Sequence, residues 1–407
     1  MQAKLTSMLT SIVLTISLLI QIPVIAAPTP VTDNTSDGYD STSVTKILEK
    51  TSISTLKAKA AILIDATSGN VLFEKNSTEK LPIASVTKIM SMLMVMEAID
   101  SGKLSFEDKV PVSEHSYNMG GSQVYLKPGE EFTVREMLKA VAVHSANDAT
   151  VALAEKVAGS EDTFVSTMNE RAKAIGMNDS NFLDCTGLTD EGHYSSAKDV
   201  AIMSRELITK HPKIFEFTTI WTDKFRDGTF DLSNTNKLIR FYQGANGLKT
   251  GFTTKAGYCL SGAAKRNNLQ LISVVLGEPD TNTRFAETRK LLDYGFANYE
   301  LTKVEAKGTP VGETDVKKGV STKVKGIFND DVNLLLNKGQ KGKISKSIKL
   351  ESLSAPVKAG TKIGEAVFTL DGKEVGKVDI VAQATVEKAS FIRLFFRMVL
   401  AWLGFGK

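Results

Sequence analysis

The sequence predicts an α+β domain with an antiparallel sheet and a helical subdomain, followed by a small all-β domain and a C-terminal amphipathic helix. Strand-like segments at 60–75 and 257–276 bracket a series of helix-like segments, an order typical of α+β domains. After residue 300 the chain becomes rich in Lys, Gly and Val and shows short alternating segments, which are typical of a small all-β domain. The 407 residues are enough for two domains.

The elements of the first domain follow from the residue pattern. Ala60–Ile64 and Val71–Phe73 flank a turn at 67–70 and predict a hairpin. The almost wholly apolar stretch 87–99 predicts a buried helix. Thr133 and Glu136 form a capping-box pattern before a helix over 137–143. Further helices are expected at 148–158, 161–175, 197–209 and 283–299, and strands at 257–263 and 269–276.

The second domain, over 301–386, contains no catalytic motif and is predicted to be a β-sandwich-like spacer. Residues 387–407 predict an amphipathic helix, with Arg393 and Arg397 on one stripe and Phe395 and Trp402 on the other side. Its central arginines make a membrane-spanning role costly, so we expect it to lie in a membrane surface. A helix that packs into a protein core is the alternative.

The first residues predict a targeting segment. Lys4 precedes an apolar stretch from Leu9 to Ile25, followed by small residues, as in a secretory signal peptide over 1–26. An uncleaved N-terminal anchor is the alternative. Residues 27–44 are rich in Thr, Ser and Asp and predict a flexible leader. We therefore expect the rest of the chain to work outside the cytoplasm.

The composition excludes several classes of protein. With 42% hydrophobic and 24% charged residues, the chain is not a disordered, collagen-like or polytopic membrane protein. The net charge of +4 is too small for a nucleic-acid binder, and residues 388–407 account for all of it with four basic and no acidic residues. The charge therefore favours an anionic membrane surface as the partner of the tail.

One serine motif is distinguished by its context. Ser-x-x-Lys occurs five times in the chain, so by itself it means little. Only at Ser85 does it directly precede a long buried helix, which places Lys88 one turn later on the same face. A lysine held against an apolar core has a lowered pKa and can act as the base for a serine nucleophile.

Ser145-Ala146-Asn147, a second motif, lies between two predicted helices. A hydroxyl and an amide on one loop can relay a proton and hold a substrate carbonyl. A helix N-cap cluster with Asp148 is the alternative.

Lys249-Thr250-Gly251, a third motif, comes just before the predicted strand 257–263. Glycine lets another chain approach a strand edge, so a substrate peptide could pair there. An ordinary turn is the alternative.

Together, the three motifs resemble those of serine-type D-alanyl-D-alanine carboxypeptidases, the low-molecular-mass penicillin-binding proteins. Their first residues are separated by 60 and 104 positions, and the resemblance runs from about residue 45 to the end. It implies a penicillin-binding/β-lactamase-like transpeptidase fold for the catalytic domain over 45–300. Further stretches that carry the resemblance are 82–88, 144–149, 186–188, 194–197 and 247–252.

The resemblance implies a role for each matching residue. Ser85 would be the nucleophile and Lys88 its general base, while Ser145 would relay the proton to the leaving D-alanine and Asn147 would position the substrate. Lys249 would be the fifth catalytic residue and support the site by its charge. The substrate-binding residues would be Thr250 and Arg284, at the terminal carboxylate, with Gly251 and Phe252. The N–H groups of Ser85 and Phe252 would form the oxyanion hole. For Arg284 a surface helix arginine is the alternative.

The resemblance also implies the reaction and its partners. The enzyme would remove the terminal D-alanine from a bacterial peptidoglycan stem peptide, on the outer face of the cytoplasmic membrane, and a β-lactam would acylate the same serine. The alternatives are a β-lactamase, a transpeptidase or an endopeptidase with the same acyl-enzyme, or an inactive wall-binding protein. Ala146 stands where β-lactamases typically carry Asp, which disfavours a β-lactamase.

Neither a metal nor a cofactor is expected, because the four histidines show no metal-ligand spacing. The only cysteines are Cys185 and Cys259. They would either form a disulfide or remain as two buried free thiols, and the sequence leaves both possibilities open.

Overall fold

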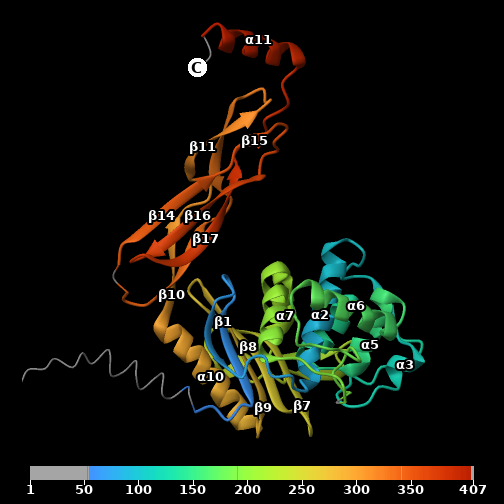
Figure 1. The fold of residues 1–407 in the computed structure, drawn as a ribbon. Coiled ribbons are helices and arrows are strands. Elements are labelled where there is room, and N and C mark those ends of the chain that lie inside the picture. The colour runs from blue at the N-terminus through green and yellow to red at the C-terminus, as the bar shows by residue number, and fades with distance from the viewer. Residues whose placement is uncertain (1–52, 54, 190, 341, 405–407) are drawn as a thin grey trace, which may run out of the picture. The chain divides into compact units, whose positions relative to one another are not determined.

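The structure, a computed structural model, describes residues 53, 55–189, 191–340 and 342–404. The predicted signal peptide over 1–26 and the predicted leader over 27–44 lie outside the described residues. Within the described part, an α+β region precedes an all-β region and a terminal helix, in the order that the sequence predicts (Figure 1).

A five-stranded antiparallel sheet forms the centre of the first region, with the strand order β2-β1-β9-β8-β7. The predicted hairpin and the two later strands are all present. Strand β7 is not among the strands that the sequence predicts, because its glycines reduce its resemblance to a strand. The strands are β1 (Ala60–Asp65), β2 (Val71–Lys75), β7 (Ala245–Thr253), β8 (Gly257–Arg266) and β9 (Leu269–Glu278).

Both faces of this sheet are buried. Along β1, the side chains of Ala60, Ile62 and Ile64 join the core on one face, and those of Ala61 and Leu63 join the core on the other. Helix α10 (Thr281–Asn298) covers the second face, whereas α2 (Lys88–Asp100) and α7 (Ala197–Lys210) belong to the first (Figure 1). The predicted apolar helix is therefore buried as expected.

The helical subdomain is inserted between β2 and β7. The Thr133–Glu136 capping box is present, with each side chain bonded to the other residue's backbone N–H. The remaining elements of this region are η1 (Ala84–Thr87), β3 (Lys109–Pro111), α3 (Glu114–Tyr117), β4 (Glu131–Thr133), α4 (Val134–Lys139), η2 (Ala140–His144), α5 (Asn147–Ala158), α6 (Glu161–Ala174), η3 (Pro212–Ile214), α8 (Phe215–Thr218), β5 (Thr222–Phe225), β6 (Phe230–Ser233) and α9 (Leu238–Phe241).

The second region is all-β, as predicted, with its own core around Phe328 and Phe368. A two-stranded sheet pairs β10 with β13, and a six-stranded sheet has the order β14-β16-β17-β12-β11-β15. Its strands are β10 (Tyr299–Glu305), β11 (Pro310–Lys317), β12 (Lys323–Phe328), β13 (Val332–Asn337), β14 (Ile344–Leu350), β15 (Leu353–Ser354), β16 (Lys362–Leu370) and β17 (Lys373–Ala382).

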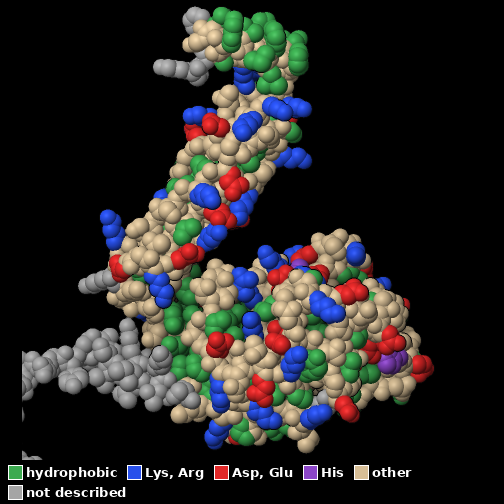
Figure 2. All heavy atoms as spheres, viewed as in Figure 1, with side chains coloured by type: hydrophobic (Ala, Val, Ile, Leu, Met, Phe, Trp, Pro, Cys, Tyr) green, Lys and Arg blue, Asp and Glu red, His purple; other side chains and the backbone are tan. Residues whose placement is uncertain are grey.

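The terminal helix α11 (Phe391–Trp402) has no buried residue along its whole described length, so it does not pack as a core helix. Figure 2 shows hydrophobic side chains gathered on it, and Phe395 and Trp402 are both exposed. Of the two predicted stripe arginines, Arg393 is exposed, but Arg397 donates to the carbonyls of Gly319 and Val320. Among the described residues, no helix has the length and apolar content needed to cross a membrane.

Candidate active site

Ser85 lies on η1, a single turn that is confined on both sides. Ala84 just before it has a φ of +48°, a backbone conformation that non-glycine residues rarely adopt. A Cβ on Gly187 would lie 1.9 Å from the Ala84 carbonyl oxygen, and a Cβ on Gly251 would lie 2.6 Å from that of Ile83. The two glycines therefore let a loop and strand β7 close directly onto the serine turn.

Lys88 begins helix α2, one turn after Ser85, and is fully buried. Its Nζ donates to Ser85 Oγ at 2.9 Å and to the Thr186 carbonyl oxygen at 2.8 Å. Burial lowers the pKa of Lys88 to about 8, against the opposing effects of Cys185, Asp184 and Asp148. A substantial share of neutral amine near neutral pH is what a general base requires.

The second motif lies on the connection between η2 and α5. Ser145 has a φ of +66°, and both Ser145 and Asn147 are buried. Asn147 Nδ2 donates to the Gly120 carbonyl oxygen at 2.6 Å, whereas its buried Oδ1 has no hydrogen-bond partner in the described part of the chain. That oxygen is suited to accept a hydrogen bond from a substrate amide.

The N-cap interpretation of this motif is wrong. Helix α5 has no side-chain cap at its start. The Asp148 carboxylate instead accepts the backbone N–H groups of Val124 and Leu126, so it secures a loop beside the motif.

Lys249 and Thr250 lie inside the edge strand β7, so the ordinary-turn interpretation is also wrong. Lys249 is fully buried, and its Nζ donates to the Thr250 carbonyl oxygen at 3.0 Å. Burial, the charge of Lys88 and the charge of Arg284 hold the pKa of Lys249 well below its usual value. The first and third motifs are therefore close enough to interact electrostatically.

The second motif lies within reach of the charge of Lys249. Burial lowers the pKa of His144, next to Ser145; Asp148 opposes this shift and the charge of Lys249 adds to it. Thr250 Oγ1 donates to Thr235 Oγ1 at 2.7 Å. Thr235 was not among the predicted residues, because no motif surrounds it in the sequence.

Arg284 supports strand β7 from helix α10. It is 7% exposed, and its Nη1 donates to the carbonyl oxygens of Gly251 and Cys259 at 3.2 and 3.4 Å. The surface-arginine alternative is therefore wrong. Phe252 is exposed at the end of the motif, and its ring lies 4.3 Å from that of Tyr258.

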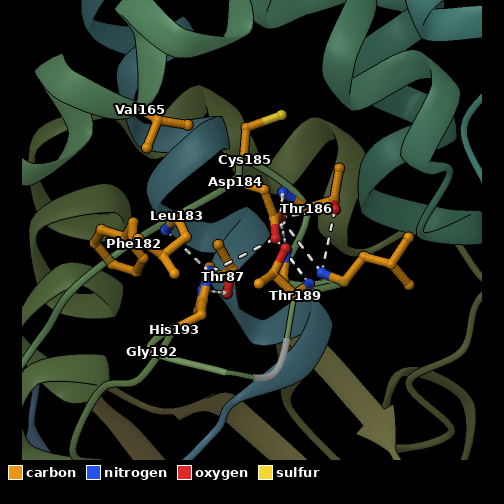
Figure 3. A network of polar contacts seen from close by, with 12 residues as sticks. Thr87, Val165, Phe182, Leu183, Asp184, Cys185, Thr186, Thr189, Gly192 and His193 are labelled. Carbon is orange, nitrogen blue, oxygen red and sulfur yellow. Dashed lines mark hydrogen bonds and ion pairs between the residues drawn. The ribbon is translucent and has the colours of Figure 1, made fainter.

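A polar network lies beside the site, and only its members Thr87 and Thr186 belong to stretches that carry the family resemblance, 82–88 and 186–188. Figure 3 shows Asp184, Thr186, Thr189 and His193 joined around one loop beside Thr87. Asp184, Thr189 and His193 belong to none of these stretches, and most contacts of the network go to backbone groups, which leave no residue pattern.

Cys185 and Cys259 are both free and buried, so the disulfide alternative is wrong. Burial raises the pKa of both thiols, to about 11 for Cys259. Among the described residues, no three His, Cys, Asp or Glu side chains form a group that could hold a metal ion.

An activated serine between a helical subdomain and the edge of an antiparallel sheet defines the class of penicillin-binding enzymes. The D-alanyl-D-alanine carboxypeptidase family model matches residues 46–280, and the model of the penicillin-binding protein 5 C-terminal domain matches residues 299–388. The chain belongs to the D-alanyl-D-alanine carboxypeptidase family. The predicted family, a serine-type carboxypeptidase of the low-molecular-mass penicillin-binding proteins, is thus confirmed.

Relatives cover most of the chain. D-alanyl-D-alanine carboxypeptidase DacF from Bacillus subtilis is 44% identical over 354 residues, which cover 86% of this chain and 91% of the relative. DacC from Escherichia coli is 34% identical, with coverages of 85% and 90%. The structure of penicillin-binding protein 5 from Haemophilus influenzae matches with a TM-score of 0.72 at 32% identity, covering 82% of this chain and 98% of that one. These matches confirm the predicted fold class.

Proposed function

We propose that the protein removes the terminal D-alanine from peptidoglycan stem pentapeptides through an acyl-enzyme on Ser85. One observation carries the proposal: a buried lysine with a lowered pKa lies 2.9 Å from that serine hydroxyl. Ser145, Asn147 and Lys249 would complete the catalytic site around this serine. Because a β-lactam resembles an acyl-D-Ala-D-Ala peptide, we expect it to acylate the same serine.

The reaction begins with proton transfer from Ser85 Oγ to neutral Lys88 Nζ. The oxygen attacks the carbonyl carbon of the penultimate D-alanine, and the N–H groups of Ser85 and Phe252 stabilise the oxyanion. Ser145 passes the proton to the departing amine as the C–N bond breaks, and D-alanine leaves. Water then attacks the ester, which releases the shortened peptide and restores the serine.

Positive charge in the site favours a substrate that ends in a carboxylate. Lys88, Lys249 and Arg284 are buried, and the charges of Lys88 and Arg284 both act on Lys249, so an incoming anion offsets this repulsion. Thr250 Oγ1 and the unpartnered Asn147 Oδ1 supply neutral contacts for the carboxylate and the peptide amide. Arg284 acts by its charge and by holding the Gly251 carbonyl in strand β7.

The nucleophile is tested by labelling with fluorescent penicillin in wild type and in Ser85→Ala. We expect the label to be lost. Ser77→Ala is a matched control, since Ser77 begins another Ser-x-x-Lys motif but bonds to Glu74 on strand β2. Labelling that persists in Ser85→Ala overturns the assignment.

The reaction is tested by D-alanine release from a peptide that ends in D-Ala-D-Ala. Steady release together with slow turnover of penicillin supports the carboxypeptidase. Rapid penicillin turnover without D-alanine release would indicate a β-lactamase instead.

We further propose that the protein is secreted by means of residues 1–26 and lies on the outer face of the cytoplasmic membrane through residues 388–407. The exposed apolar side chains of α11, including Phe395 and Trp402, would enter the lipid interface. Arg393 and the lysines at either end of the segment would meet anionic headgroups. If a chain without residues 388–407 still floats with anionic vesicles, the anchor assignment is wrong.

A further inference from the structure

We propose that Asp184 is a positioning residue for acylation, because its carboxylate folds the turn that directs the Thr186 carbonyl at Lys88. This inference rests on the proposed function, in which Lys88 takes the proton of Ser85. Asp184 itself touches no reacting atom.

The Asp184 carboxylate organises the 186–189 turn almost alone (Figure 3). Its Oδ1 accepts the backbone N–H of Thr186 at 2.7 Å, the Thr186 hydroxyl at 2.8 Å and the N–H of Gly187 at 2.5 Å. Its Oδ2 accepts the N–H of Thr189 at 2.8 Å. One charged acceptor therefore satisfies several donors that no strand or helix pairs.

The turn contacts Lys88 and the residue that precedes Ser85. The Thr186 carbonyl oxygen accepts from Lys88 Nζ, and Gly187 lies against the Ala84 carbonyl just before Ser85. Ser91, one helical turn after Lys88, donates its hydroxyl to the Cys185 carbonyl at 2.5 Å. A shift of this turn would thus move a bond partner of the base and a neighbour of the nucleophile together.

His193 connects the segment before the 186–189 turn to η1. Its Nε2 lies 2.8 Å from Thr87 Oγ1, and its Nδ1 accepts the Leu183 N–H at 3.2 Å. The Asp184 carboxylate lies 3.7 Å from the same Nδ1. The ring is 1% exposed. Through these bonds it fixes Leu183, which precedes the 186–189 turn, relative to η1, which carries Ser85.

The Thr186 carbonyl matters because of the geometry of a neutral amine. Neutral Lys88 Nζ has two N–H bonds and one lone pair. When one N–H is donated to the carbonyl, the amine is restricted in rotation and its lone pair can face the Ser85 hydroxyl. Without a fixed carbonyl, the lone pair samples other directions, and proton transfer loses its preferred alignment.

Asp184 also acts on Lys88 through its charge. Burial would raise the pKa of Asp184, but His193 and the hydrogen bonds from Thr189 and Thr186 lower it to about 2, so the carboxylate is charged during activity. The charged groups facing Lys88 are Asp184, Asp148 on α5 and Lys249 on β7, with the Cys185 thiol beside them. Removal of the Asp184 charge should therefore lower the pKa of Lys88.

The test is the pH dependence of acylation by a penicillin in Asp184→Asn, Asp184→Glu and wild type. For Asp184→Asn we expect a plateau rate at least about tenfold lower and an acid limb shifted to lower pH by roughly half a unit or more. Asp184→Glu keeps the charge but displaces it, so its plateau should fall while its acid limb stays in place.

Asp199→Asn is the matched control. Asp199 is also a buried carboxylate that holds a turn, since it accepts the Asp179 N–H at 2.7 Å and the Ser180 hydroxyl at 2.8 Å, but it is not among the groups that shift Lys88. We expect it to lower stability and leave the pH profile unchanged.

The proposal is overturned if both Asp184 variants keep the wild-type plateau and acid limb, or if Asp199→Asn moves the limb equally. Should Asp184→Asn not fold, Asp184→Glu alone decides through its plateau. Labelling of Ser85→Ala distinguishes failure of the proposed function from failure of the Asp184 inference. Persistent labelling of Ser85→Ala contradicts the proposed function, whatever the Asp184 variants do.

Discussion

Glu278, at the end of strand β9, gives a sharp prediction about stability. Its side chain is 1% exposed, and its carboxyl is hydrogen-bonded to the carboxyl of Glu287. Nearby Glu287 accepts the backbone N–H groups of Lys57 and Ala58. Burial and the adjoining Glu287 carboxyl raise the pKa of Glu278 from 4.5 to about 9. The folded protein therefore keeps this carboxyl neutral at pH 7.

The loss of folding stability follows from the difference between the pKa of Glu278 in the folded and unfolded chain. The unfolded chain releases the proton near pH 4.5, whereas the folded chain retains it up to about 9, so stability falls as the pH rises between these values. At pH 7, about 2.5 pH units above the unfolded value, the cost is about 3 kcal/mol at roughly 1.4 kcal/mol per unit. Glu278→Gln has nearly the same shape and no proton to retain, so it should remove this cost.

Urea unfolding of wild type and Glu278→Gln between pH 5 and 8 measures the effect. The variant should be the more stable at pH 7, and its advantage should grow by up to about 1.4 kcal/mol for each pH unit. Glu300→Gln, at an exposed site, should show no such trend. Equal pH dependence in wild type and Glu278→Gln would refute the reasoning.

Three further predictions concern the site and the tail. Gly251→Ala places a Cβ 2.6 Å from the Ile83 carbonyl oxygen. It should lower the free energy of unfolding in urea by about 1–3 kcal/mol and slow penicillin acylation. Wild-type values for both would contradict close packing of β7 against η1. Because Lys88 must be neutral, the acylation rate should rise with pH through about 8, and a flat profile from pH 6 to 9 would exclude it as the base. Phe395→Ser with Trp402→Ser should weaken flotation with anionic vesicles markedly, whereas equal flotation would show that these exposed side chains do not enter lipid.

The sequence identified those parts of the site that local context distinguishes. Ser85 was chosen among five Ser-x-x-Lys serines because a long apolar helix follows it, and that helix is buried. Strand β7 was missed because Gly247 and Gly251 weaken its strand pattern, although Gly251 is needed for contact with η1. The close packing of β7 against η1 joins residues that are far apart in the sequence, so the local residue pattern does not reveal it.

Residues that act through the backbone could not be found in this way. Asp184 and His193 stand in no recognisable spacing with Ser85, and their partners are mostly main-chain groups. Arg397 shows a similar limit, because the helical pattern predicts only that it shares a basic stripe with Arg393, opposite the apolar side. Its guanidinium reaches the carbonyls of Gly319 and Val320, a contact that a helical projection cannot reveal.

The buried position of Lys249 has a consequence for the thermodynamics of substrate capture. Its pKa is held down by burial and by the neighbouring cations Lys88 and Arg284. A bound carboxylate would compensate that positive charge and raise the proton affinity of the amine. Binding of an anionic peptide should therefore draw protons from solution, so that the heat of binding varies with the ionisation enthalpy of the buffer and the affinity falls as the pH rises.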